Sequence, residues 1–335
     1  MKKAISLLLV LVMILSLAAC AKTPASETPA TDAPAADAPA AETPAADASE
    51  EKTGYTFGFT EWISCEFFDS VYDGLMSVVN EHGDATVIHS EGKADSSHQQ
   101  SVIEDFIAQG CDVVFYNPVD SAASAVAVEA MKEAGIIVVN FDTQVADTSL
   151  VEAFVATNNY EAGYQAGLAM VKDFPDGGKV AVLDYPANTA AVDRADGFLA
   201  AIADSKLEVV ATLDSEGLTE TATNQMDDIL QAHPDLDAVF AINDDGGLGA
   251  YAAITAANMQ TKIYSVNGSP EAKAKVAEGG IFACTAAQST INMGKQSAEV
   301  AYKLLKGESV EHDILIDPIA ITAENIDQYG TDGWQ

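Results

Sequence analysis

Arg194 is the only arginine in the chain and lies in the segment AAVDRADGF, residues 190–198. A guanidinium offers a planar fork of hydrogen-bond donors and stays protonated in proteins. Arg194 could form a surface ion pair with Asp193 or Asp196, which would stabilise the fold by less than about 1 kcal/mol. It could instead donate to the oxygens of a ligand. The segment alone leaves both roles open.

Polar residues also follow several β-rich runs. Asp142, Asn243 and Asn267 each stand at the end of such a run. In open α/β sheets, ligands bind outside the carboxyl ends of the strands. Turns and helix caps account well for Asp120, which follows another run, and for Ser269, two residues after Asn267, but less well for these three residues. We therefore expect one set of ligand-binding residues in each half of the chain.

The motifs of common catalytic and nucleotide sites are weak or missing. Residues 247–252, GLGAYA, match G-x-G-x-x-A after a strand, but no acidic residue ends the next strand. The sequence has no G-x-S-x-G, Walker, H-E-x-x-H or paired C-x-x-C motif. No histidine falls at a strand end that we assign to the site, which disfavours an enzyme with a histidine base. We expect no catalysis, no cofactor and no metal, although abundant carboxylates keep a surface hydrolase as an alternative.

The N-terminus reads MKKAISLLLVLVMILSLAAC, with a basic start and a short apolar run. This pattern predicts an export signal at residues 1–19. The residues before Cys20 resemble the lipobox of bacterial lipoproteins, which implies acylation of Cys20; an ordinary signal peptide with a chance cysteine is the alternative. No later apolar stretch is long enough to span a bilayer.

Residues 20–53 are rich in alanine, proline and acid, in an imperfect five-residue repeat. We expect a disordered, extended tether there. The chain carries a net charge of −35, which argues against nucleic acid and anionic lipid as partners. Cys65, Cys111 and Cys284 lack metal-site spacing and are interpreted as buried free thiols.

From Tyr55 onward, short β-rich runs alternate with helical patterns. The alternation predicts an α/β fold with parallel sheets flanked by helices, divided into two lobes. The expected strands cover 55–60, 85–90, 112–117, 136–141, 152–157, 179–184, 208–213, 237–243, 262–267 and 281–288. The expected helices cover 67–82, 97–109, 121–134, 160–172, the Arg194 segment, 220–232, 244–257, 270–278 and 290–306.

Residues 54–335 resemble the periplasmic binding protein type 1 family, in particular the ribose/galactose-type sugar receptors of ABC importers. The segments that carry the resemblance are Phe67-Phe68, NPVDS, NFDTQ, AAVDRADGF, HPDLDAVFAIND and AAQ. The resemblance implies two Rossmann-like lobes joined by a three-stranded hinge near Thr157, Gln288 and Asp317. It implies an N-terminal lobe of 54–156 plus 289–317 and a C-terminal lobe of 157–288 plus 318–335.

The same resemblance implies which positions face the ligand. It implies that Phe67 and Phe68 sandwich the sugar, that Asp142 accepts from hydroxyls, that Arg194 donates, and that Asn243 and Gln288 do both. The remaining implied site positions depart from the ribose receptors, and they are Glu61, Trp62, Cys65, Thr143, Gly217 and Asn267. We expect Glu61 to pair with an amino group of the ligand or with Arg194. One of the two phenylalanines could serve only as a helix packing face.

These features together predict a monomeric solute-binding lipoprotein on the outer face of the cell membrane. It would capture a sugar or polyol and deliver it to an ABC permease, with a chemoreceptor as a further partner. A receptor for a signalling furanone or another chemoeffector on the same fold is the alternative.

Overall fold

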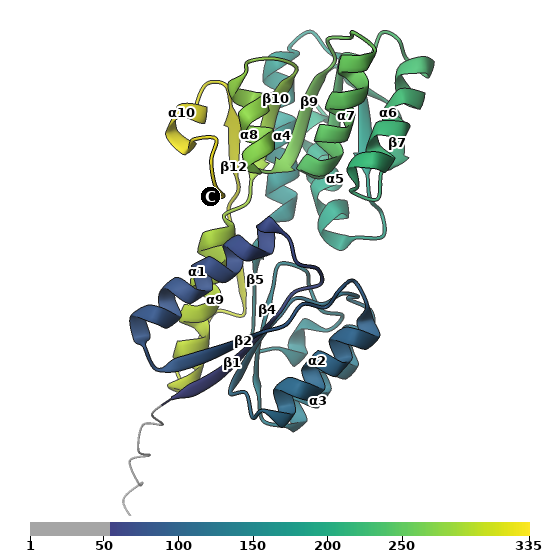
Figure 1. Ribbon diagram of the computed structural model, residues 1–335. Helices are drawn as coiled ribbons and strands as arrows, with labels where there is room; N and C mark the ends of the chain where they lie inside the picture. The colour runs from purple at the N-terminus through teal and green to yellow at the C-terminus, as the bar shows by residue number, and fades with distance from the viewer. Residues whose placement is uncertain (1–53) are drawn as a thin grey trace, which may run out of the picture. The chain divides into compact units, whose positions relative to one another are not determined.

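The computed structural model describes residues 54–335. The predicted signal peptide (1–19), the tether (20–53) and Cys20 lie outside the described residues. The predicted alternation of strands and helices is confirmed, with helix ends shifted by up to three residues (Figure 1).

The first sheet contains six parallel strands in the spatial order β11-β5-β4-β3-β1-β2. Helices α1 and α9 cover one face, and α2 and α3 cover the other. The strands are β1 (Tyr55–Thr60), β2 (Ala85–His89), β3 (Val113–Tyr116), β4 (Ile137–Phe141), β5 (Ala153–Thr157) and β11 (Asp313–Ile316). The helices are α1 (Glu66–His82), α2 (Ser96–Ala108), α3 (Ser124–Glu133), the 3-10 turn η1 (Thr148–Leu150) and α9 (Thr290–Leu305).

The second sheet has the order β12-β10-β9-β8-β6-β7, and its edge strand β12 is antiparallel. Helices α4 and α5 cover one face, and α6, α7 and α8 cover the other. The strands are β6 (Gly178–Asp184), β7 (Leu207–Asp214), β8 (Ala238–Ala241), β9 (Lys262–Asn267), β10 (Phe282–Ala287) and β12 (Ile319–Thr322). The helices are α4 (Asn159–Asp173), α5 (Thr189–Ile202), α6 (Thr219–Ala232), α7 (Asp244–Ala256), α8 (Pro270–Ala277) and the short α10 (Ile326–Tyr329).

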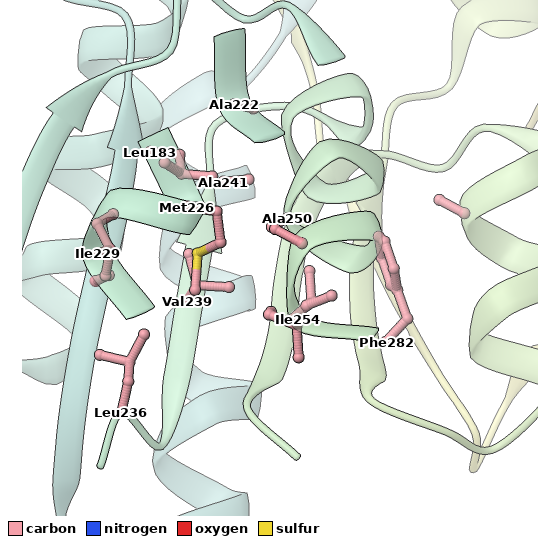
Figure 2. Close-up of a cluster of buried hydrophobic side chains, with 14 of the residues drawn as sticks. Leu183, Ala222, Met226, Ile229, Leu236, Val239, Ala241, Ala250, Ile254 and Phe282 are labelled. Atoms are coloured by element: carbon pink, nitrogen blue, oxygen red, sulfur yellow. The ribbon is translucent and has the colours of Figure 1, made fainter. Parts of the chain in front are cut away.

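Each lobe is held by apolar side chains that alternate between the two faces of its sheet. Figure 2 shows one such cluster, in which Val239 and Ala241 of β8 meet Met226 of α6 and Ile254 of α7. Burying a side chain of this size contributes about 1.5–3 kcal/mol. The sheets therefore give firm platforms for the residues at their carboxyl ends.

Two strands were not predicted, namely β11 and β12. The chain crosses from the first sheet to the second after β5, returns after β10, and crosses again between β11 and β12. These strands have four residues each, and Leu315 of β11 is 52% exposed, so their hydrophobic pattern is weak. Pairing with β5 and β10, rather than local propensity, orders them.

Close approach of helix backbones in both lobes depends on glycine. A Cβ atom on Gly163 of α4 would lie 1.8 Å from the carbonyl oxygen of Arg194, and one on Gly197 of α5 would lie 1.9 Å from that of Tyr160. Contacts below 3 Å cannot be accommodated without a shift of the backbone. These glycines therefore set the distance between α4 and α5, and with it the position of Arg194.

Among residues 54–335, no helix combines the length and apolar character that a membrane span requires.

Candidate ligand-binding site

Arg194 is buried in the second lobe, with 7% of its surface exposed. Its Nε donates to Asn159 Oδ1 at 2.8 Å, and its Nη1 donates to the Ile242 carbonyl at 3.0 Å and to Asn267 Oδ1 at 3.3 Å. Its Nη2 makes no hydrogen bond to the described residues and is not enclosed by protein atoms. The surface ion pair with Asp193 or Asp196 is therefore wrong, since two nitrogens anchor the guanidinium and leave the third free to donate.

Asn267 and Gln288 extend this network at the ends of β9 and β10. Asn267 Oδ1 also accepts from Gln288 Nε2 at 2.8 Å, so one amide oxygen receives two donors. Asn267 adopts a positive φ of 140°, which holds its side chain against these partners. Gln288 is 2% exposed, and its Oε1 is buried without a hydrogen-bond partner among the described residues.

Asp142 follows β4 in the first lobe and takes the left-handed backbone conformation, with φ at 55°. Its Oδ2 accepts from Asn117 Nδ2 at 3.2 Å and from Thr143 Oγ1 at 3.1 Å. Its Oδ1 makes no hydrogen bond to residues 54–335. Thr143 therefore orients the carboxylate, and one oxygen of Asp142 remains available as an acceptor.

Asp142 and Arg194 lie in different lobes and influence each other electrostatically. Burial raises the pKa of Asp142, and the charge of Arg194 acts in the opposite direction. Burial lowers the pKa of Arg194 to about 10, while Asp142, Asp244 and Asp193 oppose this shift. At neutral pH Arg194 is a cation, so the second lobe offers an uncommitted donor and the first lobe an uncommitted acceptor.

Glu61 differs from the expectation. It is 1% exposed, and both carboxylate oxygens lie 2.8 Å from Nε2 of His89 rather than near Arg194. His89 ends β2 and is adjacent to β1 through the Phe59–His89 register, and its ring stacks on Tyr72 at 4.6 Å. His89 is not at one of the strand ends that we assigned to the site, but it contacts Glu61, one of the implied site residues. A buried carboxylate needs a partner, and the neighbouring strand supplies it.

The two phenylalanines play different roles. Phe68 is 4% exposed and packs edge-on against Phe141 in the core of the first lobe. Phe67 is half-buried and contacts the rings of Phe68 and Trp334. The structure thus gives Phe68 the packing role that the sequence allowed for one of them, and leaves Phe67 as the aromatic surface.

The loop between β1 and α1 also carries Trp62 and Cys65. Trp62 is 38% exposed, and its backbone N–H donates to Asn117 Oδ1 at 3.1 Å. Cys65 is exposed, which corrects the expectation of a buried thiol; Cys111 and Cys284 are buried and unpaired as expected. Surrounding protein atoms, followed by the charges of Asp142 and Asp69, raise the pKa of Cys65, so its thiol stays protonated.

Asn243 and Gly217 form a structural pair in the second lobe. Asn243 Oδ1 accepts from the Gly246 N–H and caps α7, while its Nδ2 donates to the Gly217 carbonyl at 2.8 Å. Gly217 has a left-handed φ of 65°, and a Cβ atom there would lie 3.0 Å from Asn243 Nδ2. Asn243 thus has the capping role that the sequence analysis considered insufficient, and its amide oxygen and amide nitrogen each make one hydrogen bond within the second lobe.

The structure also places near the site several residues that the sequence analysis did not assign to it. Asn159 Oδ1 accepts a hydrogen bond from Arg194 Nε and so holds the guanidinium in place. Asn117 Nδ2 donates to the Phe141 carbonyl and to Asp142 Oδ2, which holds the chain at the end of β4. Asn159 is the first residue of α4 and resembles an ordinary cap, so no sequence signal marked it. Thr157, at the end of β5, has a buried hydroxyl without a partner in the described part of the chain. Trp334, near the C-terminus, was not expected in this region.

A surface cavity of about 790 Å³ lies elsewhere. It is lined by residues that include Asp173, Asp237, Met259 and Lys262. Asp237 precedes β8 and Lys262 begins β9, so the cavity is at the amino ends of these strands. It contains none of the predicted site residues.

The two α/β lobes, with polar residues at the carboxyl ends of their strands, define a two-lobed ligand-binding protein. Residues 60–309 match the family model described as periplasmic binding protein domain. The chain belongs to the periplasmic binding protein family, of the type 1 fold.

Named relatives agree with this assignment. The chain is 32% identical over 316 residues to the ribose import binding protein of Bacillus subtilis (strain 168), covering 94% of this chain and 97% of the relative. An ABC transporter solute-binding protein from Agrobacterium vitis with bound D-fucose has a TM-score of 0.74 and 27% identity, covering 82% of this chain and 97% of the other. One from Mycobacterium smegmatis with bound glycerol has a TM-score of 0.77 and 28% identity, covering 84% and 99%. These relatives are binding proteins, and the chain is accordingly a binding protein and not an enzyme.

Proposed function

We propose that the chain captures one sugar or related polyol between the two lobes and releases it unchanged. The observation that carries this proposal is the state of Arg194, which is buried and anchored through Nε and Nη1 but keeps Nη2 uncommitted. A guanidinium held in this way is preorganised to donate to ligand oxygens, so little entropy is lost on binding.

The other groups suit a ligand with several hydroxyls. A hydroxyl both donates and accepts, and Asp142 Oδ1 and Gln288 Oε1 are acceptors that complement the Arg194 donor. Phe67 and Trp62 offer aromatic surface for the C–H face of a sugar ring. A compound that lacks a matching hydroxyl would leave a buried group unpaired, which gives the site its specificity.

The site need not be limited to ribose. Thr143 orients Asp142 and supplies no second cation, and Gly217 carries no side chain beside Asn243. Relatives named for ribose and D-fucose bracket the expected size. We propose a pentose or hexose as the ligand class, in furanose or pyranose form.

The three crossings after Thr157, Ala287 and Ile316 are proposed to act as the hinge on which the lobes close. Delivery to an ABC permease and anchoring through an acylated Cys20 complete the proposal. Radiolabelled palmitate should be incorporated into the full-length chain and not into Cys20→Ala, which should be released from the membrane. Label that persists in Cys20→Ala would contradict anchoring at Cys20.

A thermal-shift screen tests sugar binding directly. The panel consists of D-ribose, D-allose, L-arabinose, D-fucose and myo-inositol. We expect at least one to raise the melting temperature, since ligand binding stabilises the folded state. Asp142→Asn should reduce that rise strongly, whereas Asp147→Asn, which changes the exposed carboxylate that caps η1, should not. No rise with any panel member would refute the proposed ligand class.

A further inference from the structure

The last residues of the chain, Gly330–Gln335, form a segment that we name the C-terminal tail. Lys273 of α8 holds this segment in the second lobe. Lys273 is fully buried, and its Nζ donates to the Gly333 carbonyl at 2.7 Å. Burying an ammonium group is costly, and the Gly333 carbonyl and the nearby charges of Asp332 and Asp244 offset that cost. Lys273 therefore attaches the tail to the second lobe.

The end of the tail contacts the first lobe. The Gln335 carbonyl accepts from the Ile291 N–H in the first turn of α9 at 3.2 Å. The Trp334 ring meets Phe67 of α1 edge-to-face, with ring centroids 5.5 Å apart and an angle of 88° between planes. The tail therefore connects α8 of one lobe with α1 and α9 of the other. Phe67 is the aromatic residue that remains for the ligand once Phe68 is assigned to the core.

Trp334 carries an unsatisfied donor. Its indole Nε1 is buried and has no hydrogen-bond acceptor among residues 54–335. Buried polar groups without a partner are rare, and each costs about 1–3 kcal/mol. The neighbouring residue Gln335 is bonded to Ile291, three positions after Gln288, whose Oε1 is also buried and unpartnered. Trp334 thus carries a buried donor, and Gln288 carries a buried acceptor, that have no partner among the described residues.

We propose that Trp334 is a specificity-determining residue of the sugar site. Its ring fixes the orientation of Phe67, and its indole N–H donates to a hydroxyl of the bound sugar. The tail is then part of the binding site, with Lys273 as the residue that positions it. This inference rests on the proposed function, because it requires a hydroxylated ligand beside Phe67.

The chain has two tryptophans, Trp62 and Trp334, so the indole N–H region of a ¹H–¹⁵N spectrum contains two side-chain signals. The Trp62→Phe variant assigns them. The probe is the panel sugar with the largest thermal shift on the wild-type chain. We expect that sugar to move the Trp334 signal downfield, as a newly hydrogen-bonded N–H does.

Two variants of Trp334 distinguish the contribution of its ring to sugar affinity from that of its N–H group. Trp334→Phe keeps an aromatic contact with Phe67 and should weaken binding of the same sugar by about 3- to 10-fold. Trp334→Ala removes both contributions and should weaken it further, by about 10-fold or more. Lys273→Met should lower affinity by releasing the tail. Lys275→Met is the matched control, since Lys275 lies on the same helix and pairs with Glu278 at the surface, and it should bind as the wild type does.

The outcomes distinguish this inference from the proposed function. If the wild-type chain binds a panel sugar while the Trp334 signal stays in place and both Trp334 variants bind equally well, the inference is overturned and the proposed function stands. If Trp334→Phe binds as weakly as Trp334→Ala with an unmoved signal, Trp334 only anchors the tail, and the inference is also overturned. If the wild-type chain binds no panel sugar, the proposed function fails and this inference fails with it.

Discussion

Replacing Arg194 by lysine keeps the charge and removes the fork. The guanidinium donates to Asn159 at 2.8 Å, to the Ile242 carbonyl at 3.0 Å and to Asn267 at 3.3 Å. A lysine ammonium is a point charge that cannot reproduce this planar arrangement. The substitution should therefore leave two of the three acceptors without their donor.

The expected loss of stability follows from these contacts. Hydrogen bonds that involve a charged group contribute about 1.5–3 kcal/mol each, and lysine recovers a part through one remaining bond. We expect Arg194→Lys to lower the free energy of unfolding by about 2–4 kcal/mol. At roughly 2–4 °C per kcal/mol, the melting temperature should fall by roughly 4–16 °C. Sugar-induced stabilisation should be lost as well, because Nη2 is absent.

Denaturant unfolding and thermal shift with and without panel sugar measure both effects. Lys172→Ala is the control, because its ion pair with Glu324 is largely exposed and should contribute less than about 1 kcal/mol. If Arg194→Lys unfolded with the same free energy as Lys172→Ala and kept full sugar-induced stabilisation, the account of Arg194 would be refuted.

Three further substitutions test the framework around the site. Gly163→Ala should lower the free energy of unfolding by about 1–3 kcal/mol, because the added Cβ atom pushes α4 away from α5. Gly280→Ala is the control and should be close to neutral, because there is open space around Gly280. Equal denaturation midpoints for the two variants would contradict this prediction. Burial raises the pKa of Asp142, so the carboxylate becomes protonated, and sugar affinity should fall, as the pH drops through that raised value. Calorimetry on Asp142→Asn should show weak binding without this pH dependence. Glu61→Ala should destabilise the chain by about 0.5–1.5 kcal/mol by removing the hydrogen bonds to His89, whose exposed ring can bond to water instead. Sugar affinity should change little, and a large loss of affinity would return Glu61 to the binding site.

Much of the fold could be predicted because each buried strand is a short apolar run and each helix shows helical periodicity of its apolar residues. The helix ends agree with the expected ones within a few residues, and the polar residues at strand ends mark the carboxyl edge of each sheet. Strands β11 and β12 escaped prediction, because they have four residues each and are ordered by pairing with distant strands.

The side-chain partners in the site could be predicted only in part. Arg194 was identified as a candidate donor, but its anchor Asn159 is distant in sequence and resembles a helix cap. Of the two partners expected for Glu61, Arg194 is wrong, because only the pairing of β1 with β2 shows that His89 is within reach. The tail was missed for the same reason, since nothing near Trp334 in the sequence indicates Phe67. Long-range contacts of this kind are set by topology and not by local pattern.

The central claim is that the chain binds one sugar and does not transform it. Calorimetric titration of the full chain with the panel sugar of largest thermal shift, followed by mass spectrometry of the recovered sugar, tests it most directly. We expect saturable binding of one sugar per chain, much weaker binding in Asp142→Asn, and recovery of the sugar unchanged. Conversion of the sugar to a product, or binding that is unaffected in Asp142→Asn, would contradict the account.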